Sequence, residues 1–348
     1  MRNFIDIDSR LADVPGPVVA RLRHIDRGAG REDLYAHQVP ALLDQLATRA
    51  RVESITASSA IEGVVVEPSR ASRIVSGAVS RLGNRSEQEL AGYRDALDHL
   101  WGDEPDELSV GLVLYLHRLL FGRTEASGGR LKEEDNLVVD IDDTGARRVR
   151  FRPVSARETP YYMDELVVRY REAQASGRHH PALLVGLFAL DLSIIHPFVD
   201  GNGRVLRVLT NHLLAQVGYG VTRFVSLEQL LHDDRDRYYD ALAASTSGWR
   251  DDAADVWPWL AFFVGKVELA YAVFEDRATV SRATGTKQQR VRDHVRHHAP
   301  ATFSMADLRA ALPDISDVTI RLVLAELRDA GEIAADGTGR SARWARQR

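Results

Sequence analysis

The spacing of apolar and polar residues along the sequence predicts a mainly α-helical chain. Two apolar runs, residues 183–195 and 205–217, have the length of buried helices. The residues between them are mostly polar, Gly or Pro, which favours a tight loop joining two helices in the core. Two short extended runs, residues 136–139 and 148–151, flank the turn-rich segment 140–145 and predict a small β-hairpin.

The N-terminal region, residues 1–101, is predicted to be largely helical. Residues 1–35 contain two prolines and a Gly-rich stretch, which predicts an arm rather than a packed element. Residues 36–101 follow the apolar periodicity of amphipathic helices, with a break at 83–86. One of these helices is expected to begin near Pro40.

The C-terminal part of the chain has a pattern of its own. Periodicity is lost over residues 276–286, which contain Ser, Thr and Gly and predict a linker. The sequence then predicts three helices and two strands, at residues 287–298, from Ser304 to near Leu312, at 317–330, at 331–334 and at 343–344. This order resembles a winged helix–turn–helix domain over residues 287–348. The chain would then consist of the N-terminal region, a central core at 102–275, the linker and this domain.

Composition narrows the class of protein. A chain of 348 residues suits two or three domains, and 45% hydrophobic with 27% charged residues is typical of soluble proteins. The absence of cysteine excludes disulfides and thiolate metal sites. A net charge of −5 gives no ground for general nucleic-acid affinity. No apolar run has membrane-spanning length and no signal segment is evident, so we expect a cytoplasmic protein without membrane contact.

The central loop and the helix after it have the features of a phosphate site. A helix N-terminus presents free N–H groups and a partial positive charge. Gly201 and Gly203 let the backbone approach an anion closely. Arg204 and Arg207 are three residues apart, hence on one helical face, and both can bind phosphate oxygens. Asn202 can bind a phosphate or stabilise the loop.

Two further side chains of the loop add reactive chemistry. Asp200 is a hard oxygen ligand of the kind that Mg²⁺ takes next to phosphates. His196 titrates near neutral pH and can deprotonate an attacking hydroxyl. An isolated G-x-G or a His before Pro is usually structural, but a polar cluster between two buried helices needs partners. The combination predicts transfer of a phosphate-containing group from a nucleotide.

The residues from His196 to Arg207 resemble the signature of the Fic (filamentation induced by cAMP) family. That signature reads His-x-Phe-x-Asp/Glu-Gly-Asn-Gly-Arg-x-x-Arg, and each specified position matches. The resemblance implies that His196 is a general base toward a Ser, Thr or Tyr hydroxyl of a target protein. It also implies that Asp200 holds Mg²⁺, and that the loop amides and both arginines hold the phosphates of ATP. Gly203 stands where the phosphate-transferring Doc-type branch has Lys, which favours AMP as the transferred group.

A second stretch, residues 51–63, resembles the inhibitory motif of the same family, Ser/Thr-x-x-x-Glu-Gly/Asn. Ser58 and Glu62 are four residues apart, on one face of a helix, and Gly63 is a natural helix end. The resemblance implies that Glu62 pairs with Arg207 and that the chain inhibits itself. Arg207 can bind a carboxylate or the γ-phosphate of ATP, but not both well.

Two other features fit the family. The hairpin resembles its target-docking flap, which would align a target segment on its exposed edge, although a plain surface hairpin is an equal alternative. The flap residues would be Asn136, Leu137, Val138 and Val139. The adjacent residues Tyr238 and Tyr239 resemble a position near the adenine, although paired tyrosines also serve helix packing. Thr246 stands where such relatives often have Asn.

The C-terminal domain leaves two interpretations open. It carries eleven basic and eight acidic residues. A winged helix can bind DNA through basic residues such as Arg321, Arg328, Arg340 and Arg343, but it can also serve protein interaction or dimerisation. Related proteins often form homodimers.

The sequence therefore predicts a self-inhibited protein adenylyltransferase that uses ATP and Mg²⁺, with self-modification as a side reaction. Two alternatives are removal of AMP by the same site, with Glu62 orienting water, and a nucleotide-sensing, DNA-binding regulator. The presence of His196 favours an enzyme, because a sensor needs the phosphate site but no base.

Overall fold

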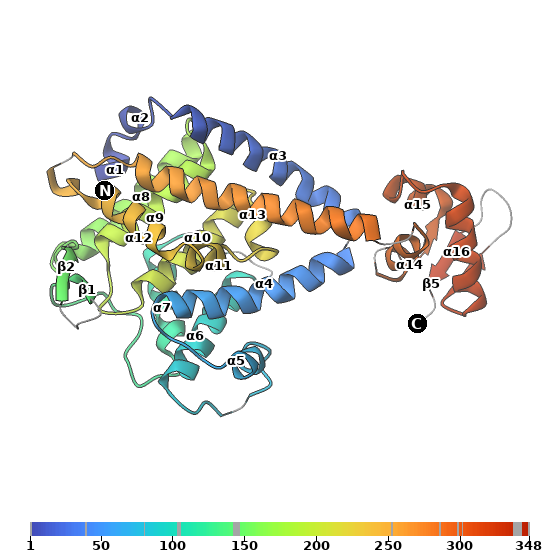
Figure 1. Ribbon diagram of the computed structural model, residues 1–348, viewed down its shortest axis with the longest axis horizontal. Coiled ribbons are helices and arrows are strands. Elements are labelled where there is room, and N and C mark those ends of the chain that lie inside the picture. Colours follow the sequence, from blue (N-terminus) through green and yellow to red (C-terminus); the bar gives the residue numbers. More distant parts are fainter. Residues whose placement is uncertain are drawn as a thin grey trace.

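The computed structural model describes residues 2–38, 40–79, 81–102, 106–141, 147–251, 253–284, 287–297, 299–300, 302–336 and 343–346. It confirms a mainly helical fold with a small hairpin (Figure 1). The elements of the larger part are α1 (Arg2–Ile5), α2 (Ile7–Arg10), α3 (Gly16–Gln38), α4 (Pro40–Ile61), α5 (Pro68–Val75), α6 (Arg85–Leu100), α7 (Val110–Phe121), β1 (Val138–Ile141), β2 (Arg147–Phe151), α8 (Thr159–Ser176), α9 (Pro181–Ile195), α10 (Asn202–Gln216), η1 (Gly220–Arg223), α11 (Leu227–His232), α12 (Arg235–Thr246), η2 (Trp249–Asp251) and α13 (Trp257–Thr284).

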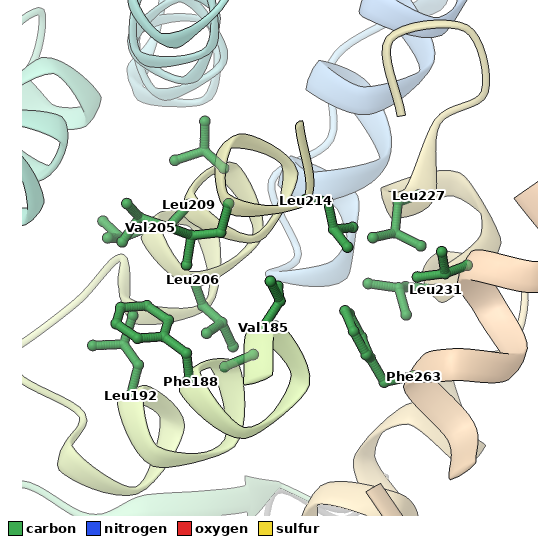
Figure 2. Packing of buried hydrophobic residues seen from close by; sticks show 14 of the residues in the cluster. Val185, Phe188, Leu192, Val205, Leu206, Leu209, Leu214, Leu227, Leu231 and Phe263 are labelled. Atoms are coloured by element: carbon green, nitrogen blue, oxygen red, sulfur yellow. The ribbon is translucent and has the colours of Figure 1, made fainter. Parts of the chain in front are cut away.

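Helix α9 is the centre of the fold. Nearly all of its side chains are buried, because α8, α10, α12 and α13 pack around it. Figure 2 shows its inner residues meeting apolar side chains of α10, α11 and α13; those labelled are Val185, Phe188, Leu192, Val205, Leu206, Leu209, Leu214, Leu227, Leu231 and Phe263. This packing holds both helices that flank the polar loop.

The long helix α13 packs against α9 and runs beside α3 (Figure 1). The indole Nε1 of Trp259 donates a hydrogen bond to the carbonyl of Gly186 in α9, at 2.7 Å. A Cβ at Gly186 would lie 2.7 Å from a methyl carbon of Leu260. The glycine therefore permits the close approach of the two helices.

The expectation of an N-terminal arm is wrong. Residues 2–10 form two short helices, and α3 covers the next part up to Gln38. Pro17 lies in the first turn of α3, where a proline is tolerated because the first N–H groups of a helix have no partner within it. Apolar side chains of this region join the main core: Phe4, Ile7, Leu11, Val18, Leu22 and Ile25.

The expected linker at 276–286 is also different in the structure. Helix α13 continues through Thr284, and residues 285–286 lie outside the described part of the chain. The segment 276–284 contains neither Gly nor Pro, so nothing in it ends a helix. The weak periodicity therefore marked the end of a core-packed helix rather than a loop.

The first strand of the hairpin begins two residues later than predicted, at Val138 instead of Asn136. Strands β1 and β2 are antiparallel, with Val139 opposite Val149, and the register is irregular between Val138 and Val139. Asn136 and Leu137 precede the strand. The predicted turn falls largely on residues 142–146, outside the described residues.

The C-terminal elements form a second, smaller core. They are α14 (Lys287–His297), β3 (Thr302–Ser304), α15 (Met305–Ala311), α16 (Asp317–Asp329), β4 (Ile333–Asp336) and β5 (Arg343–Arg346). The strands make one sheet in the order β3-β5-β4, and β3 was not predicted. Ser304 caps α15 as expected, in a capping box with Asp307. In Figure 1 this unit lies at the far end of α13 from the hairpin.

Among the helices that the structure describes, none combines the length and the apolar character needed to cross a lipid bilayer.

Close packing of α6 on α7 predicts a specific sensitivity. A Cβ at Gly92 would overlap the backbone carbonyl oxygen of Leu120, so one helix would have to move. We expect Gly92→Ala to lower the free energy of unfolding by about 2 kcal/mol in urea titrations. Gly30→Ala is the matched control, because Gly30 is exposed in α3 with open space around it. Equal stability of the two variants would contradict this packing.

Candidate active site

His196 ends helix α9 in a left-handed conformation, with φ 49° and ψ 62°. It is the sole residue other than glycine with positive φ among those described. Such a backbone costs roughly 1–2 kcal/mol and persists where the surroundings impose it. Here the His196 N–H donates to the carbonyl of Leu192 at 3.0 Å, while the Lys132 N–H donates to the carbonyl of Pro197 at 2.8 Å.

The turn into α10 depends on Gly201 and Asn202. Gly201 has φ 79°, and a Cβ there would lie 2.8 Å from the ring of Phe121. The side chain of Asn202 accepts the Phe198 N–H at 2.9 Å and donates to the Phe198 carbonyl at 2.8 Å. Of the two roles considered for Asn202, the structure therefore contains the loop-stabilising one.

Arg207 binds both predicted residues of the inhibitory stretch. Its Nε donates to the hydroxyl of Ser58 at 2.9 Å, and its Nη2 donates to the Ser58 carbonyl at 2.9 Å and to Glu62 Oε1 at 2.8 Å. The guanidinium is 3% exposed and Glu62 is 32% exposed. The ion pair is therefore well shielded on the arginine side and open on the carboxylate side. Gly63, with φ 78°, follows at the helix end.

Gly203 is the point where the carboxylate meets the first turn of α10. A Cβ at Gly203 would overlap Glu62 Oε1 and would lie 3.0 Å from Arg207 Nη1. The carboxylate therefore occupies an anion position at a helix N-terminus that only glycine leaves open.

A cavity of about 620 Å³ opens next to this ion pair. Its walls come from the end of α4, the hairpin, the loop, α10 and α12. The predicted residues that line it are Glu62, Val138, Val139, His196, Asn202, Gly203, Arg207, Tyr238 and Tyr239, together with Thr246. These residues are far apart in sequence, and the fold brings them to one surface.

The two tyrosines lie differently in that wall. Tyr238 is buried and packs on Trp259, with ring centroids 5.9 Å apart. Burial raises the pKa of Tyr238 to about 12. The ring of Tyr239 has the guanidinium of Arg150 over it at 4.8 Å and that of Arg235 at 5.6 Å. Arg150 belongs to β2, so Tyr239 ties the hairpin to α12.

Arg204 does not point where it was expected. It is 1% exposed, donates to Glu89 at 2.6 Å and does not line the cavity. Asp200 is 56% exposed, and its carboxylate lies 3.4 Å from both Arg204 and Arg85. Arg204 therefore connects the loop to α6, because a buried guanidinium needs a carboxylate partner. Phosphate binding by Arg204 stays a prediction.

Asn136 supports the loop rather than an exposed edge. Its side chain donates to the Phe198 carbonyl at 2.8 Å and accepts from Lys132 Nζ at 2.9 Å. Leu137 and Val139 are exposed, and Val138 is half-buried in the cavity wall. Of the four expected flap residues, three therefore remain suited to meet a partner.

Lys132 was missed in the sequence. It is buried, donates from Nζ to the carbonyl of Ile195 at 3.1 Å, and burial lowers its pKa to about 8. Burial, followed by the charge of Lys132, lowers the pKa of His196 to about 4. The imidazole is therefore neutral at pH 7 and able to accept a proton. A single lysine before a hairpin carries no sequence signal of this role.

His117, on α7, is a second missed residue. Its Nδ1 accepts the Gly129 N–H at 2.8 Å, and its Nε2 lies 3.0 Å from the Asp200 carbonyl, which fixes the neutral tautomer with the proton on Nε2. Its ring stacks on Phe198 at 3.7 Å. Burial lowers its pKa to about 4. The sequence did not mark His117, because it lies on the buried face of α7 among core positions.

The two depressed histidine pKa values predict a pH dependence of stability. Since the folded state favours neutral imidazole, stability is complete above the ordinary pKa of 6.5 and decreases as pH falls toward about 4. From pH 7 to pH 5, we expect His117→Gln to lose roughly 2 kcal/mol less unfolding free energy than the parent protein in urea titrations. The same loss in both proteins would show that His117 does not titrate this way.

Comparison with known proteins finds similarity over the segment that contains this site. Residues 107–214 match the model of the Fic/DOC family. Protein adenylyltransferase fic-1 of Caenorhabditis elegans is 28% identical over 142 residues, 39% of this chain and 25% of that protein. Protein adenylyltransferase Fic of Drosophila ananassae is 24% identical over 254 residues, 71% of this chain and 46% of that protein. The chain thus spans half or less of these relatives.

Solved structures share the fold. A Fic family protein from Desulfovibrio desulfuricans superposes with a TM-score of 0.64 at 22% identity, over 96% of this chain and 97% of that one. Fic-1 of C. elegans superposes with a TM-score of 0.60 at 21% identity, over 76% of this chain and 73% of that one. Residues 107–214, which contain the loop from His196 to Arg207, are therefore similar to the Fic/DOC family, and the fold is shared with solved Fic structures.

Proposed function

We propose that this chain is a protein adenylyltransferase that moves AMP from ATP to a hydroxyl of a target protein and that inhibits itself. The observation that carries the proposal is the ion pair of Glu62 with Arg207, in a cavity that also holds His196. A base, an anion site at a helix N-terminus and a carboxylate inside that site belong to one mechanism. The relatives named protein adenylyltransferases support the reaction class.

The residues divide the chemistry among them. The oxygen of a Ser, Thr or Tyr hydroxyl attacks the α-phosphorus of ATP, and its proton passes to neutral His196. The bond between the α-phosphorus and the bridging oxygen breaks, and pyrophosphate leaves. Arg207 and the N–H groups at the start of α10 bind phosphate oxygens and offset the charge that accumulates on the leaving group.

Asp200 is the residue that fits Mg²⁺. The described residues contain no cluster of three His, Asp or Glu that could hold a metal. A Mg²⁺ ion that arrives with ATP needs only one or two carboxylates beside the phosphates, and Asp200 is exposed. The ion would neutralise phosphate charge.

Inhibition follows from competition for one guanidinium. Glu62 occupies the place on Arg207 and beside Gly203 that a phosphate would take. In the closed state Glu62 binds Arg207, and in the open state Arg207 is available to phosphate. A preference of about 2.7 kcal/mol for the closed state keeps the open state near 1%. Breaking a shielded ion pair costs about 3–5 kcal/mol, which is sufficient.

The target would dock on the hairpin. Val139 and Val149 are exposed there, next to the cavity, and a strand edge can take up an extended segment through backbone hydrogen bonds. A segment placed this way brings its hydroxyl near His196. The chain's own hydroxyls are also candidates, so self-modification is expected.

DNA binding by the C-terminal unit is not part of the proposal. Several of its arginines meet acids of the same unit: Arg309 and Arg321 with Asp317, Arg328 with Asp329, Arg292 with Glu326, and Arg296 with Glu332. Such pairs weaken the attraction of arginine for phosphate. Arg340 lies outside the described residues.

Removal of Glu62 provides the first test. If the open state is near 1%, Glu62→Gly should raise AMP transfer from labelled ATP about a hundredfold. Glu62→Gln should raise it less, and Glu53→Gln, on the same helix but in a surface pair with Arg49, should leave it unchanged. Equal transfer by wild type and Glu62→Gly would refute self-inhibition. If Glu62 instead orients water for AMP removal, Glu62→Gly should lose that activity on a modified target.

Removal of the base provides the second test. In the Glu62→Gly protein, His196→Ala should lower AMP transfer by about 10²–10⁴-fold, because the hydroxyl loses its proton acceptor. Calorimetric titration with Mg·ATP should show unchanged affinity. Transfer that survives His196→Ala would eliminate His196 as the base. Binding without any transfer, in every variant, would favour a nucleotide sensor.

A further inference from the structure

A second carboxylate, Glu228, lies buried behind the site and belongs to no expected motif. It stands in the first turn of α11 and is 0% exposed. Within the described part of the chain it forms no ion pair. Its partners are the Tyr93 hydroxyl at 2.8 Å, Asn211 Nδ2 at 2.6 Å and the Ser226 hydroxyl at 3.4 Å. A buried carboxylate without a cation is costly, so a positive charge nearby would explain its presence.

That charge is Arg207, reached through two hydroxyls. Arg207 Nε donates to Ser58 Oγ at 2.9 Å, the Ser58 hydroxyl interacts with the neighbouring Tyr93 hydroxyl, and Tyr93 donates to Glu228 Oε1 at 2.8 Å. An arginine can only donate and a carboxylate can only accept. Every hydroxyl in the series therefore points its proton from the guanidinium toward the carboxylate.

The series is closed off from water. Ser58, Tyr93 and Glu228 are each 0% exposed. Hydrogen bonds that are shielded from water polarise one another along the series. The charges of Arg207 and Glu228 therefore stabilise each other without direct contact. The four residues come from α4, α6, α10 and α11.

We propose that Glu228 is a positioning residue that holds Arg207 in its phosphate-binding orientation through Tyr93 and Ser58. This rests on the proposed function, in which Arg207 receives the γ-phosphate of ATP. Arg207 then has two carboxylates of different kinds. Glu62 is partly exposed, binds directly and can leave, whereas Glu228 is buried, acts at a distance and stays. The guanidinium is kept in place during the exchange of Glu62 for phosphate.

Side-chain contacts between the surrounding helices support this division of roles. Ser54, one turn before Ser58 on α4, donates to the Ser226 hydroxyl at 3.0 Å, and Asn211 lies one turn after Arg207 on α10. Helix α4, which ends just before Glu62, is thus held by polar contacts that do not involve Glu62. Release of the Glu62 side chain needs no departure of α4.

Nucleotide selectivity tests the proposal. All proteins carry Glu62→Gly to free Arg207 and His196→Ala to prevent turnover, and calorimetry measures affinity for Mg·ATP and for AMP. We expect Tyr93→Phe and Glu228→Gln each to weaken ATP by about tenfold, as the loss of a hydrogen bond that supports a charged group would. AMP binding should be unchanged, because AMP has no γ-phosphate. Tyr170→Phe is the matched control, a buried tyrosine outside the site.

The outcomes separate clearly. Equal weakening of ATP and AMP would reveal a general disturbance of the site, and unchanged ATP affinity would show that the series does not hold Arg207; either overturns the proposal. If Glu228→Gln does not fold, Tyr93→Phe decides, since it removes one oxygen. A Glu62→Gly protein that binds ATP without transferring AMP would overturn the proposed function and leave this measurement valid.

Discussion

The site depends on the burial of one positive charge, the guanidinium of Arg207. A cation that is 3% exposed must be matched by negative charge in every state of the protein, whether the cavity is empty or filled. Glu62 provides that match in the structure, and its place at the start of α10 makes it a stand-in for an anionic ligand. On the proposed function, the position of the Glu62 carboxylate marks where a phosphate would bind.

Around this charge, the loop is held almost entirely by its backbone carbonyls. Asn136 and Asn202 bind the carbonyl of Phe198, while Lys132 binds that of Ile195 and His117 that of Asp200. His117 comes from α7, Lys132 and Asn136 come from the segment between α7 and β1, and Asn202 is the first residue of α10. A polar loop in a buried setting has many unpaired groups, and a well-defined shape requires that they all find partners.

The sequence predicted the features that depend on residues close together along the chain. The apolar runs predicted α9 and α10, and the four-residue spacing of Ser58 and Glu62 predicted that they share one helix face. The pairing of Glu62 with Arg207 was implied by the family resemblance. It failed where contacts are long-range. The partner of Arg204 was not predicted, because its carboxylate, Glu89, is 115 residues away in the chain. Tyr93 and Glu228 are 135 residues apart, and neither has a local pattern that marks it. The N-terminal arm and the linker failed differently, because Pro, Gly, Ser and Thr can begin or end packed helices as well as loops.

The depressed pKa of His196 has a consequence for rate. An imidazole with its ordinary pKa of 6.5 changes its protonation across the pH range of living cells, whereas one with a pKa of about 4 is nearly all unprotonated throughout it. A weaker base removes a proton less readily, so the chemical step becomes slower at any pH at which both imidazoles would be unprotonated. In return, the rate hardly varies when the pH of the surroundings drifts. If His196 is the base of the proposed reaction, the release of Glu62 from Arg207 would control the rate more strongly than pH does.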